Sequence, residues 1–470
     1  YLTMATRRRA NNEWTGGNRD AALDGLFQSL RNKASRSLGR SDISIGLESE
    51  ALLVGLPLPA LCLRYLFQST VFPLSRIIQI TGQEGSCKSA FQFELMRWHH
   101  VYGGGSVFIE NELKDSPELR WSMLQWNPVW LARHEFIQTY YLEEWQDALT
   151  KFVDVAKQQQ DAEHGPGRTI PIMFSVDSLT ATAPRELAKK IEEEGHATRS
   201  FALAANLISG YMRTMPGRIE RYPFTVCGTN HLKPSTDFMG RPTSTVPGGK
   251  SIKFMETYEI EMERIADINK LEYGGIRVRL LAKKNSLGPS RKQIAADMLW
   301  WNSYIGDTVR QQTAWDWDTA SVDLLLSFAE STEKDKSGKK TLYNHLRDIV
   351  RIDVTQRGQR LATCPTLGFN EPVEYRRIGA ALERRPDLLE QIYGLLGIQR
   401  RLSFQPGLDY RDMLAAEQAA GAAEAATLYT DVQSMPEADV DALDPAHAAV
   451  PPMGEPSTLD DFELDDDEEA

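Results

Sequence analysis

The hydrophobic positions of this chain alternate between two spacings from about residue 41 to about residue 330. At helical spacing, Phe91, Leu95 and Trp98 mark one face of a helix that extends to about residue 102. Short apolar runs of the kind found in buried strands lie at 76–81, 107–109, 170–176, 224–227, 258–262 and 276–281. Strands that alternate with helices predict an α/β core with a largely parallel sheet over residues 41–330.

Two shorter regions flank the predicted core. Residues 1–40 form an N-terminal segment with a short amphipathic helix, whose apolar face carries Leu23, Leu26, Phe27 and Leu30. This helix is a candidate for a contact between protomers, and burial on its own core is the alternative. A charged linker follows the core at 333–340. Beyond it, Pro386 stands where a helix would start, and the apolar face that follows predicts a small helical C-terminal domain at 341–411.

The formal net charge of −12 is concentrated at the end of the chain. Residues 431–470 carry 14 acidic side chains and no Lys or Arg, which leaves 53 basic against 51 acidic residues, a net charge of +2, elsewhere. Residues 412–470 are therefore predicted as an Ala-rich linker and a disordered acidic tail. A solvated terminus, a nucleic-acid mimic that competes for a basic groove, and a docking peptide around Phe462 and Leu464 all fit this composition.

Cysteine usage and hydropathy bear on the compartment. The four cysteines, at positions 62, 87, 227 and 364, form no metal-binding spacing, which suits a reducing cytoplasm and argues against a disulfide scaffold or a zinc site. The longest apolar run, at 51–63, is interrupted by prolines and is too short to span a bilayer. The N-terminal residues contain no apolar signal region. We therefore expect a cytoplasmic protein that makes no contact with membranes.

The strongest chemical signal directly follows the predicted strand at 76–81. It consists of Gly82, Gln83, Glu84, Gly85, Ser86, Cys87, Lys88 and Ser89. A strand, a glycine-containing loop and a helix are the context of a P-loop, whose backbone N–H groups hold a polyphosphate. Lys88 would reach the β- and γ-phosphates, and Ser89 would bind Mg²⁺. Cys87 replaces the glycine of the common pattern, so its side chain must point away from the phosphates. A plain strand–turn–helix with a surface lysine is the alternative.

Two further predicted strands end in acidic residues. Asp177 ends an apolar strand and would orient Mg²⁺ through water, as in the second half of a P-loop ATPase site. Glu110 and Glu112 follow the strand at 107–109, and either carboxylate would polarise the water that attacks the γ-phosphate. Strand alternation aims both carboxylates to the same side, so periodicity does not choose between them.

These motifs resemble the RecA family of recombinases, and the phage UvsX branch more than bacterial RecA. The resemblance covers about residues 41–300; it includes the entry into the P-loop at 72–82 and the replacement of glycine by Cys87. In this family the catalytic glutamate follows a small residue, a position that falls on Glu112. The γ-phosphate sensor falls on His231, where bacterial RecA has glutamine. The resemblance therefore implies that Glu112, Lys88 and His231 carry out ATP hydrolysis and sense its state.

The resemblance also implies where DNA would bind. The second DNA-binding loop would lie at 232–249, and the first within 185–201. The implied DNA-binding residues are Arg199, Arg213, Lys233, Phe238, Arg241, Gly248 and Gly249. Backbone phosphates would meet the cations and the N–H groups, while Phe238 would insert between bases. A Gly/Pro/Thr-rich surface loop without function is the alternative. Lys283 lies where the family places a lysine that reaches the ATP of a neighbouring protomer.

The sequence thus predicts an ATP- and Mg²⁺-dependent recombinase, a DNA-dependent ATPase in the cytoplasm, or in the host-cell cytoplasm if a phage encodes it. Its partners would be single-stranded DNA, homologous duplex DNA, further copies of itself in a helical filament, and single-strand-binding and mediator proteins. A hexameric helicase or loader with the same ATPase core is one alternative. A paralogue that does not hydrolyse ATP is the other, and an intact Lys88, Glu112 and Asp177 argue against it.

Overall fold

The fold was analysed in a computed structural model of the 470-residue chain. The structure describes residues 54–114, 116–162, 169–194, 201–236, 242–245, 247, 250–305, 308–330, 342–406, 408–414 and 416. The expected helix at 23–30, the linker at 333–340 and the acidic tail at 431–470 therefore lie outside the described residues. No helix in the described part of the chain combines the length and the apolar composition that a membrane span requires.

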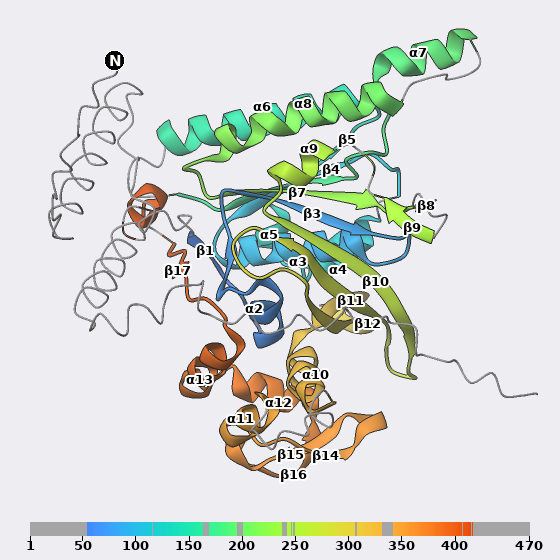
Figure 1. Ribbon diagram of the computed structural model, residues 1–470. Helices are drawn as coiled ribbons and strands as arrows, with labels where there is room; N and C mark the ends of the chain where they lie inside the picture. The colour runs from blue at the N-terminus through green and yellow to red at the C-terminus, as the bar shows by residue number, and fades with distance from the viewer. Residues whose placement is uncertain are drawn as a thin grey trace, which may run out of the picture. The chain divides into compact units, whose positions relative to one another are not determined.

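A nine-stranded sheet forms the centre of the protein, in the order β13-β12-β11-β10-β3-β7-β6-β4-β5 (Figure 1). Its strands are β3 (Arg76–Gly82), β4 (Gly105–Glu110), β5 (His134–Gln138), β6 (Ile172–Asp177), β7 (Phe224–His231), β10 (Tyr258–Asn269), β11 (Gly274–Asn285), β12 (Lys292–Ile305) and β13 (Thr308–Asp316). All neighbours from β10 to β5 are parallel, whereas β10 to β13 pair antiparallel. The predicted α/β fold with a largely parallel sheet is confirmed.

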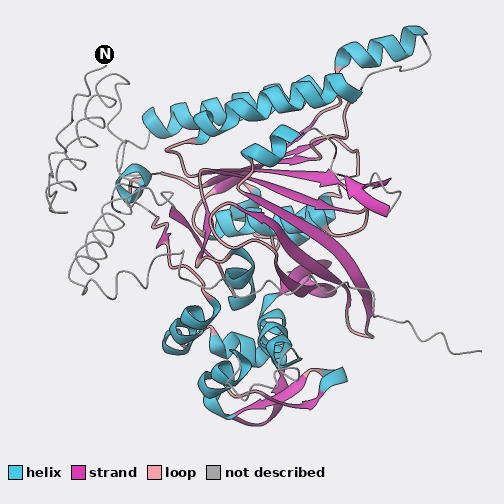
Figure 2. Cartoon of the chain, in the orientation of Figure 1, coloured by secondary structure: helices cyan, strands magenta, loops and turns pink. Residues whose placement is uncertain are grey.

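Helices cover both faces of this sheet (Figure 2). They are α2 (Leu61–Phe67), α3 (Lys88–Val101), α4 (Pro117–Met123), α5 (Pro128–Leu131), α6 (Leu142–Ala162), α8 (Phe201–Ile219) and α9 (Lys250–Met255), whereas α7 (Arg185–Glu194) is mostly exposed. Alternate strand residues enter two separate cores: Phe108 packs in the cluster that contains Phe91 of α3, while Ile109 packs in the cluster that contains Trp145 of α6. Burial on both faces explains why these strands are nearly continuous apolar runs.

Outside the central sheet, the described residues form three smaller sheets, one of which lies in the region beyond β13. β1 (Val54–Pro57) pairs with β2 (Val71–Pro73) and, in parallel, with β17 (Leu402–Ser403), so the chain returns to the core near its C-terminal end. β8 (Lys233–Thr236) and β9 (Pro242–Thr245) form a hairpin directly after β7. The predicted DNA-binding loop at 232–249 therefore contains regular structure.

The region beyond β13 contains both helices and strands. The helices are α10 (Trp317–Glu330), α11 (Leu342–Ile349), α12 (Tyr375–Leu382) and α13 (Pro386–Leu396), with short 3₁₀ turns η2 (Arg357–Gln359) and η3 (Pro365–Leu367). α13 begins at Pro386, as expected. The region predicted as a small helical domain also contains strands that were not predicted: β14 (Asp353–Gln356), β15 (Leu361–Cys364) and β16 (Phe369–Glu374) form an antiparallel sheet. Strands of four to six residues are too short to give a clear period-two signal.

The interior of this region includes residues from the core segment. Val322 and Leu325 of α10 lie in one apolar cluster with Ile378 and Leu382 of α12, and Leu61 of α2 joins the same cluster. Contacts join residues 51–417 into one compact unit. The domain boundaries expected at 330 and 341 remain predictions.

Candidate functional site

The loop between β3 and α3 turns sharply around two left-handed residues, Gly85 with φ of 76° and Cys87 with φ of 64°. The Ser86 hydroxyl donates to the carbonyl of Gln83 at 2.7 Å, which closes the loop on itself. A Cβ atom at Gly82 would lie 2.4 Å from the carbonyl oxygen of Met262, so only glycine fits there. This close packing brings the loop against β10, at the N-terminus of α3.

Cys87 directly precedes α3 and adopts the left-handed conformation that favours glycine. Its side chain is partly buried against the apolar cluster that contains Phe91, and Sγ lies 3.9 Å from the Gly85 carbonyl oxygen. Burial raises the pKa of the thiol to about 11, so it is uncharged at neutral pH. The side chain is thus accommodated by the core.

Lys88 is buried in the first turn of α3. Its Nζ donates to the carbonyl oxygens of Gly82 at 3.1 Å and Gln83 at 2.7 Å, so the side chain lies along the loop. Burial lowers the pKa of this amine, and nearby carboxylates, of which Asp177 has the largest effect, oppose that shift. Lys88 therefore places a positive charge directly beneath the loop.

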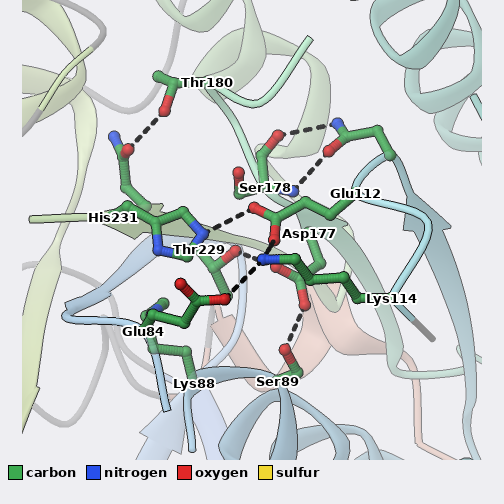
Figure 3. Close-up of polar contacts among 12 residues, drawn as sticks. Glu84, Lys88, Ser89, Glu112, Lys114, Asp177, Ser178, Thr180, Thr229 and His231 are labelled. Carbon is green, nitrogen blue, oxygen red and sulfur yellow. Dashed lines mark hydrogen bonds and ion pairs between the residues drawn. The ribbon is translucent and has the colours of Figure 1, made fainter. Parts of the chain in front are cut away.

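Ser89 and Asp177 come together at the carboxyl end of β6. The Ser89 hydroxyl donates to Oδ2 of Asp177, and the Thr229 hydroxyl donates to Oδ1 at 2.5 Å (Figure 3). Burial raises the pKa of Asp177. Thr229 was not predicted, because its contact with Asp177 joins β7 to β6 across 52 positions of sequence. A hydroxyl and a carboxylate side by side are oxygen donors that suit Mg²⁺, which usually takes only one or two protein ligands.

The two acidic residues after β4 have different surroundings. β4 ends at Glu110, so Glu112 lies in the bend beyond the strand and the expected alternation does not extend to it. Glu110 is buried, and its Oε1 accepts the backbone N–H groups of Glu112 at 2.9 Å and Lys114 at 3.1 Å. The Glu110 carboxylate thus holds the bend, while the Glu112 side chain projects over the P-loop (Figure 3).

Asn111, between these two residues, ties the bend to the end of β6. Its Oδ1 accepts the backbone N–H of Ser178 at 2.7 Å, and its Nδ2 donates to the Ser178 carbonyl at 2.8 Å. The Asn111 backbone N–H also donates to the carbonyl of Asp177 at 2.9 Å. The sequence analysis missed this role, although an amide between two carboxylates is a visible signal. These three hydrogen bonds of Asn111 fix the position of Glu112 relative to Asp177.

His231, the last residue of β7, contacts Glu112. Its Nε2 lies 2.8 Å from Oε1 of Glu112, and this hydrogen bond lowers the pKa of the carboxyl to about 2 (Figure 3). The next residue inward, Asn230, accepts a hydrogen bond from Thr180 at 2.6 Å and donates to the carbonyl of Pro247 at 2.8 Å. The end of β7 therefore touches both the acidic bend and the far end of the 232–249 loop.

Two exposed charged residues, Lys114 and Glu84, complete the site. Lys114 places Nζ 3.0 Å from Oε1 of Glu84 in the P-loop and 3.6 Å from Oε2 of Glu112 (Figure 3). Glu84 was expected to bind nucleotide, whereas Lys114 was missed because the family resemblance gives no role to that position. The only indication of Lys114 in the sequence was a basic residue two positions after Glu112.

Few residues of the expected DNA-binding set can be placed. Arg213 is exposed on α8, and the backbone of Lys233 begins β8. The others lie outside the described residues: Arg199, Phe238, Arg241, Gly248 and Gly249. Of the range 185–201, within which the first loop was expected, residues 185–194 form helix α7 and residues 195–200 lie outside the described residues, so the loop stays a prediction. Glu186 and Lys190 pair at i,i+4 spacing with 2.7 Å between Nζ and Oε1, which supports that helix.

Lys283 lies on β11 at an irregularity in its pairing with β10. Glu259 faces Lys284 and Ile260 faces Ala282, which leaves Lys283 as an extra, bulged residue. Its Nζ lies 2.6 Å from Oε2 of Glu261 and 3.9 Å from Oε1 of Glu259. Within the described residues, no group of three or more His, Cys, Asp or Glu side chains could hold a metal ion.

The central sheet and the strand–loop–helix turn at the carboxyl end of β3 define an α/β protein with a largely parallel sheet, which is consistent with a RecA-like core. The family model of the RecA N-terminal domain matches residues 168–304. Protein RecA of a Nocardioides species is 25% identical over 288 residues, which cover 61% of this chain and 75% of the relative. Protein RecA of Clostridium acetobutylicum is 26% identical over 284 residues, which cover 60% and 73%. The chain is therefore similar to RecA proteins over about three fifths of its length.

Proposed function

We propose that this protein is an ATP-dependent DNA recombinase that polymerises on single-stranded DNA and catalyses homologous pairing and strand exchange. One observation carries the proposal: Lys88, Ser89, Glu112, Asp177 and His231, from four separate segments, converge over one strand–loop–helix turn (Figure 3). The family similarity supports the recombinase role. The replacement of glycine by Cys87 and the histidine at 231 favour the UvsX branch within it.

The P-loop would hold the nucleotide. Residues 82–89 offer backbone N–H groups at the N-terminus of α3, where anionic phosphates are stabilised. Lys88 would exchange the carbonyls of Gly82 and Gln83 for phosphate oxygens. Ser89 and Asp177 would hold Mg²⁺, which neutralises charge on the phosphates. Lys283 would reach the nucleotide of the next protomer in a filament.

Glu112 would act as the general base of hydrolysis. Its hydrogen bond with His231 lowers the pKa of the carboxyl, so the side chain is ionised at neutral pH and can orient a water by accepting its hydrogen. Glu112 would orient a water for attack on the γ-phosphorus, which breaks the bond to the β-phosphate and releases ADP and phosphate. Glu110 is better suited to hold the bend, because both of its described backbone partners lie within that bend.

His231 would couple the presence of the γ-phosphate to DNA binding. It bonds to Glu112 on one side, and its neighbour Asn230 bonds to Pro247 at the end of the predicted DNA loop. A phosphate that draws His231 from Glu112 would therefore move the strand end that holds this loop. DNA would be gripped by Lys233, Phe238, Arg241, Gly248 and Gly249 of that loop, with Arg199 and Arg213 adding phosphate contacts.

The replacement Lys88→Ala tests the nucleotide site. We expect loss of ATP binding, because the loop loses its buried cation. Equilibrium binding of ATP to the variant and to wild type is the measurement, with thermal unfolding to show that the variant folds. Lys270→Ala, at the exposed turn between β10 and β11, is the matched control and should bind normally. Normal ATP affinity in Lys88→Ala would contradict the assignment.

A further inference from the structure

The bend after β4 holds a lysine in a fixed position over the P-loop. Glu110 accepts the backbone N–H groups of both Glu112 and Lys114, so this carboxylate organises the segment. Leu113 between them is left-handed, with φ of 58°, and 67% exposed. Such a backbone is unfavourable for leucine, and packing of this exposed side chain does little to offset it. The hydrogen bonds to Glu110 therefore maintain the bend that directs Lys114 back toward the loop.

The amine of Lys114 bridges two carboxylates that belong to different parts of the site. It lies 3.0 Å from Glu84 of the P-loop and 3.6 Å from Glu112. The Lys114–Glu84 pair is open to solvent, with side chains that are 59% and 80% exposed. Exposed pairs of this kind contribute little to stability, so a more highly charged anion can replace Glu84 readily.

A triphosphate offers Lys114 more negative charge than the Glu84 carboxylate does. Around the P-loop, the carboxylates of Glu84, Glu112 and Asp177 face the amines of Lys88 and Lys114. A nucleoside triphosphate with one bound Mg²⁺ still carries about two negative charges at neutral pH. Lys88 is buried beneath the loop, whereas Lys114 stands at its mouth on the side of Glu112. Of these two amines, Lys114 is therefore the one placed beside the carboxylate that would face a terminal phosphate.

We propose that Lys114 is a nucleotide-binding residue that leaves Glu84 for the terminal phosphate of a nucleoside triphosphate and thereby distinguishes it from a diphosphate. The proposal rests on the proposed function and adds to it a specificity-determining residue. With a diphosphate, Lys114 keeps Glu84 as its partner. With a triphosphate, the same amine joins the γ-phosphate beside Glu112.

Equilibrium binding of a slowly hydrolysed MgATP analogue and of MgADP tests this, since it does not depend on turnover. In Lys114→Met, we expect analogue affinity to fall by about 10- to 100-fold, while ADP affinity stays within about twofold. Lys114→Arg should retain most of the preference for the analogue. Lys270→Met, at the exposed hairpin turn, is the matched control and should resemble wild type.

A double-mutant cycle with Glu84→Gln separates this role from a structural ion pair. Without Glu84, Lys114 no longer has to give up its nearer ion pair, so Lys114→Met should weaken analogue binding more in the Glu84→Gln background than in wild type. Equal loss of analogue and ADP affinity, or no loss, in Lys114→Met would overturn the proposal and leave the nucleotide site intact. Failure of wild type to bind either nucleotide would overturn the proposed function itself.

Discussion

Nε2 of His231 lies 2.8 Å from Oε1 of Glu112, and this contact spans strand β6, which separates their two strands in the sheet. It joins the end of β7, which leads into the 232–249 loop, to the bend that would carry out hydrolysis. The His231 side chain is 30% exposed and that of Glu112 is 12% exposed, so both can be reached by a nucleotide.

The replacement His231→Ala should uncouple the nucleotide from DNA. We expect ATP affinity within about threefold of wild type, because His231 is not part of the P-loop, while the gain in DNA affinity with ATP over ADP disappears. His231→Gln is the matched control, since its amide N–H can still donate to Glu112. The measurement is affinity for single-stranded DNA with each nucleotide. An unchanged ATP-to-ADP ratio in His231→Ala would remove this residue from the switch.

The replacement Glu112→Gln should preserve binding of ATP and DNA but slow hydrolysis by at least about 100-fold, because the amide cannot accept a proton from water. Filaments on DNA should then persist. Glu110→Gln should instead weaken the bend, and we expect lower thermal stability together with weaker nucleotide binding. Steady-state hydrolysis and filament lifetime distinguish the two variants. A Glu110→Gln variant that folds normally, binds ATP and fails only in hydrolysis would show that Glu110 is the base.

Substitutions at Cys87 measure how much a side chain in the left-handed conformation lowers the free energy of unfolding. Cys87→Gly relieves backbone strain but adds freedom to the unfolded chain, so we expect a change in unfolding free energy within about 1 kcal/mol. Cys87→Val should lose about 1–2 kcal/mol, since β-branched residues tolerate this conformation poorly. Urea unfolding provides both values, with Cys87→Ala reporting the packing of the thiol alone. If Gly and Val destabilise equally, packing rather than backbone conformation controls this position.

Local patterns identify the interior of the fold better than its edges. Strands buried on both faces, such as β3, β6 and β7, are continuous apolar runs and were predicted. β5 was missed because it pairs with β4 alone, so its residues 134–138 are mostly exposed or half-buried. Within the range 185–201, the helix α7 was not predicted, although Glu186 and Lys190 have helical spacing.

The residues of the site likewise fall into those that local sequence patterns reveal and those that they do not. Lys88, Ser89 and Asp177 belong to short motifs whose neighbours in sequence reveal the chemistry. Thr229 and Lys114 act through partners 52 and 30 positions away, Asp177 and Glu84, and no local pattern encodes those distances. Strand periodicity left Glu110 and Glu112 open, and only the family resemblance pointed to Glu112. The different surroundings of the two residues follow from the point at which β4 ends, which strand periodicity does not supply.

Glu256, between α9 and β10, should make stability depend on pH. Burial raises the pKa of its carboxyl to about 8, the charge of Glu259 adds to this, and the amines of Lys284 and Lys253 oppose it. Because the unfolded pKa is lower, near 4.5, the stability contributed by the protonated form is complete below that pH and is lost as pH rises through about 8. Glu256→Gln should therefore gain thermal stability over wild type with rising pH, by about 3 °C or more at alkaline pH. Melting temperatures of both proteins at acidic and alkaline pH test this, and a constant difference would contradict it.

Electron microscopy of the protein with single-stranded DNA and a slowly hydrolysed ATP analogue tests the central claim most directly. A recombinase of the RecA family should form helical filaments that coat the DNA, with Lys283 of one protomer near the nucleotide of the next. Filaments should be absent for Lys88→Ala under the same conditions. Closed rings with wild-type protein would contradict the account and indicate a hexameric helicase or loader built on the same core.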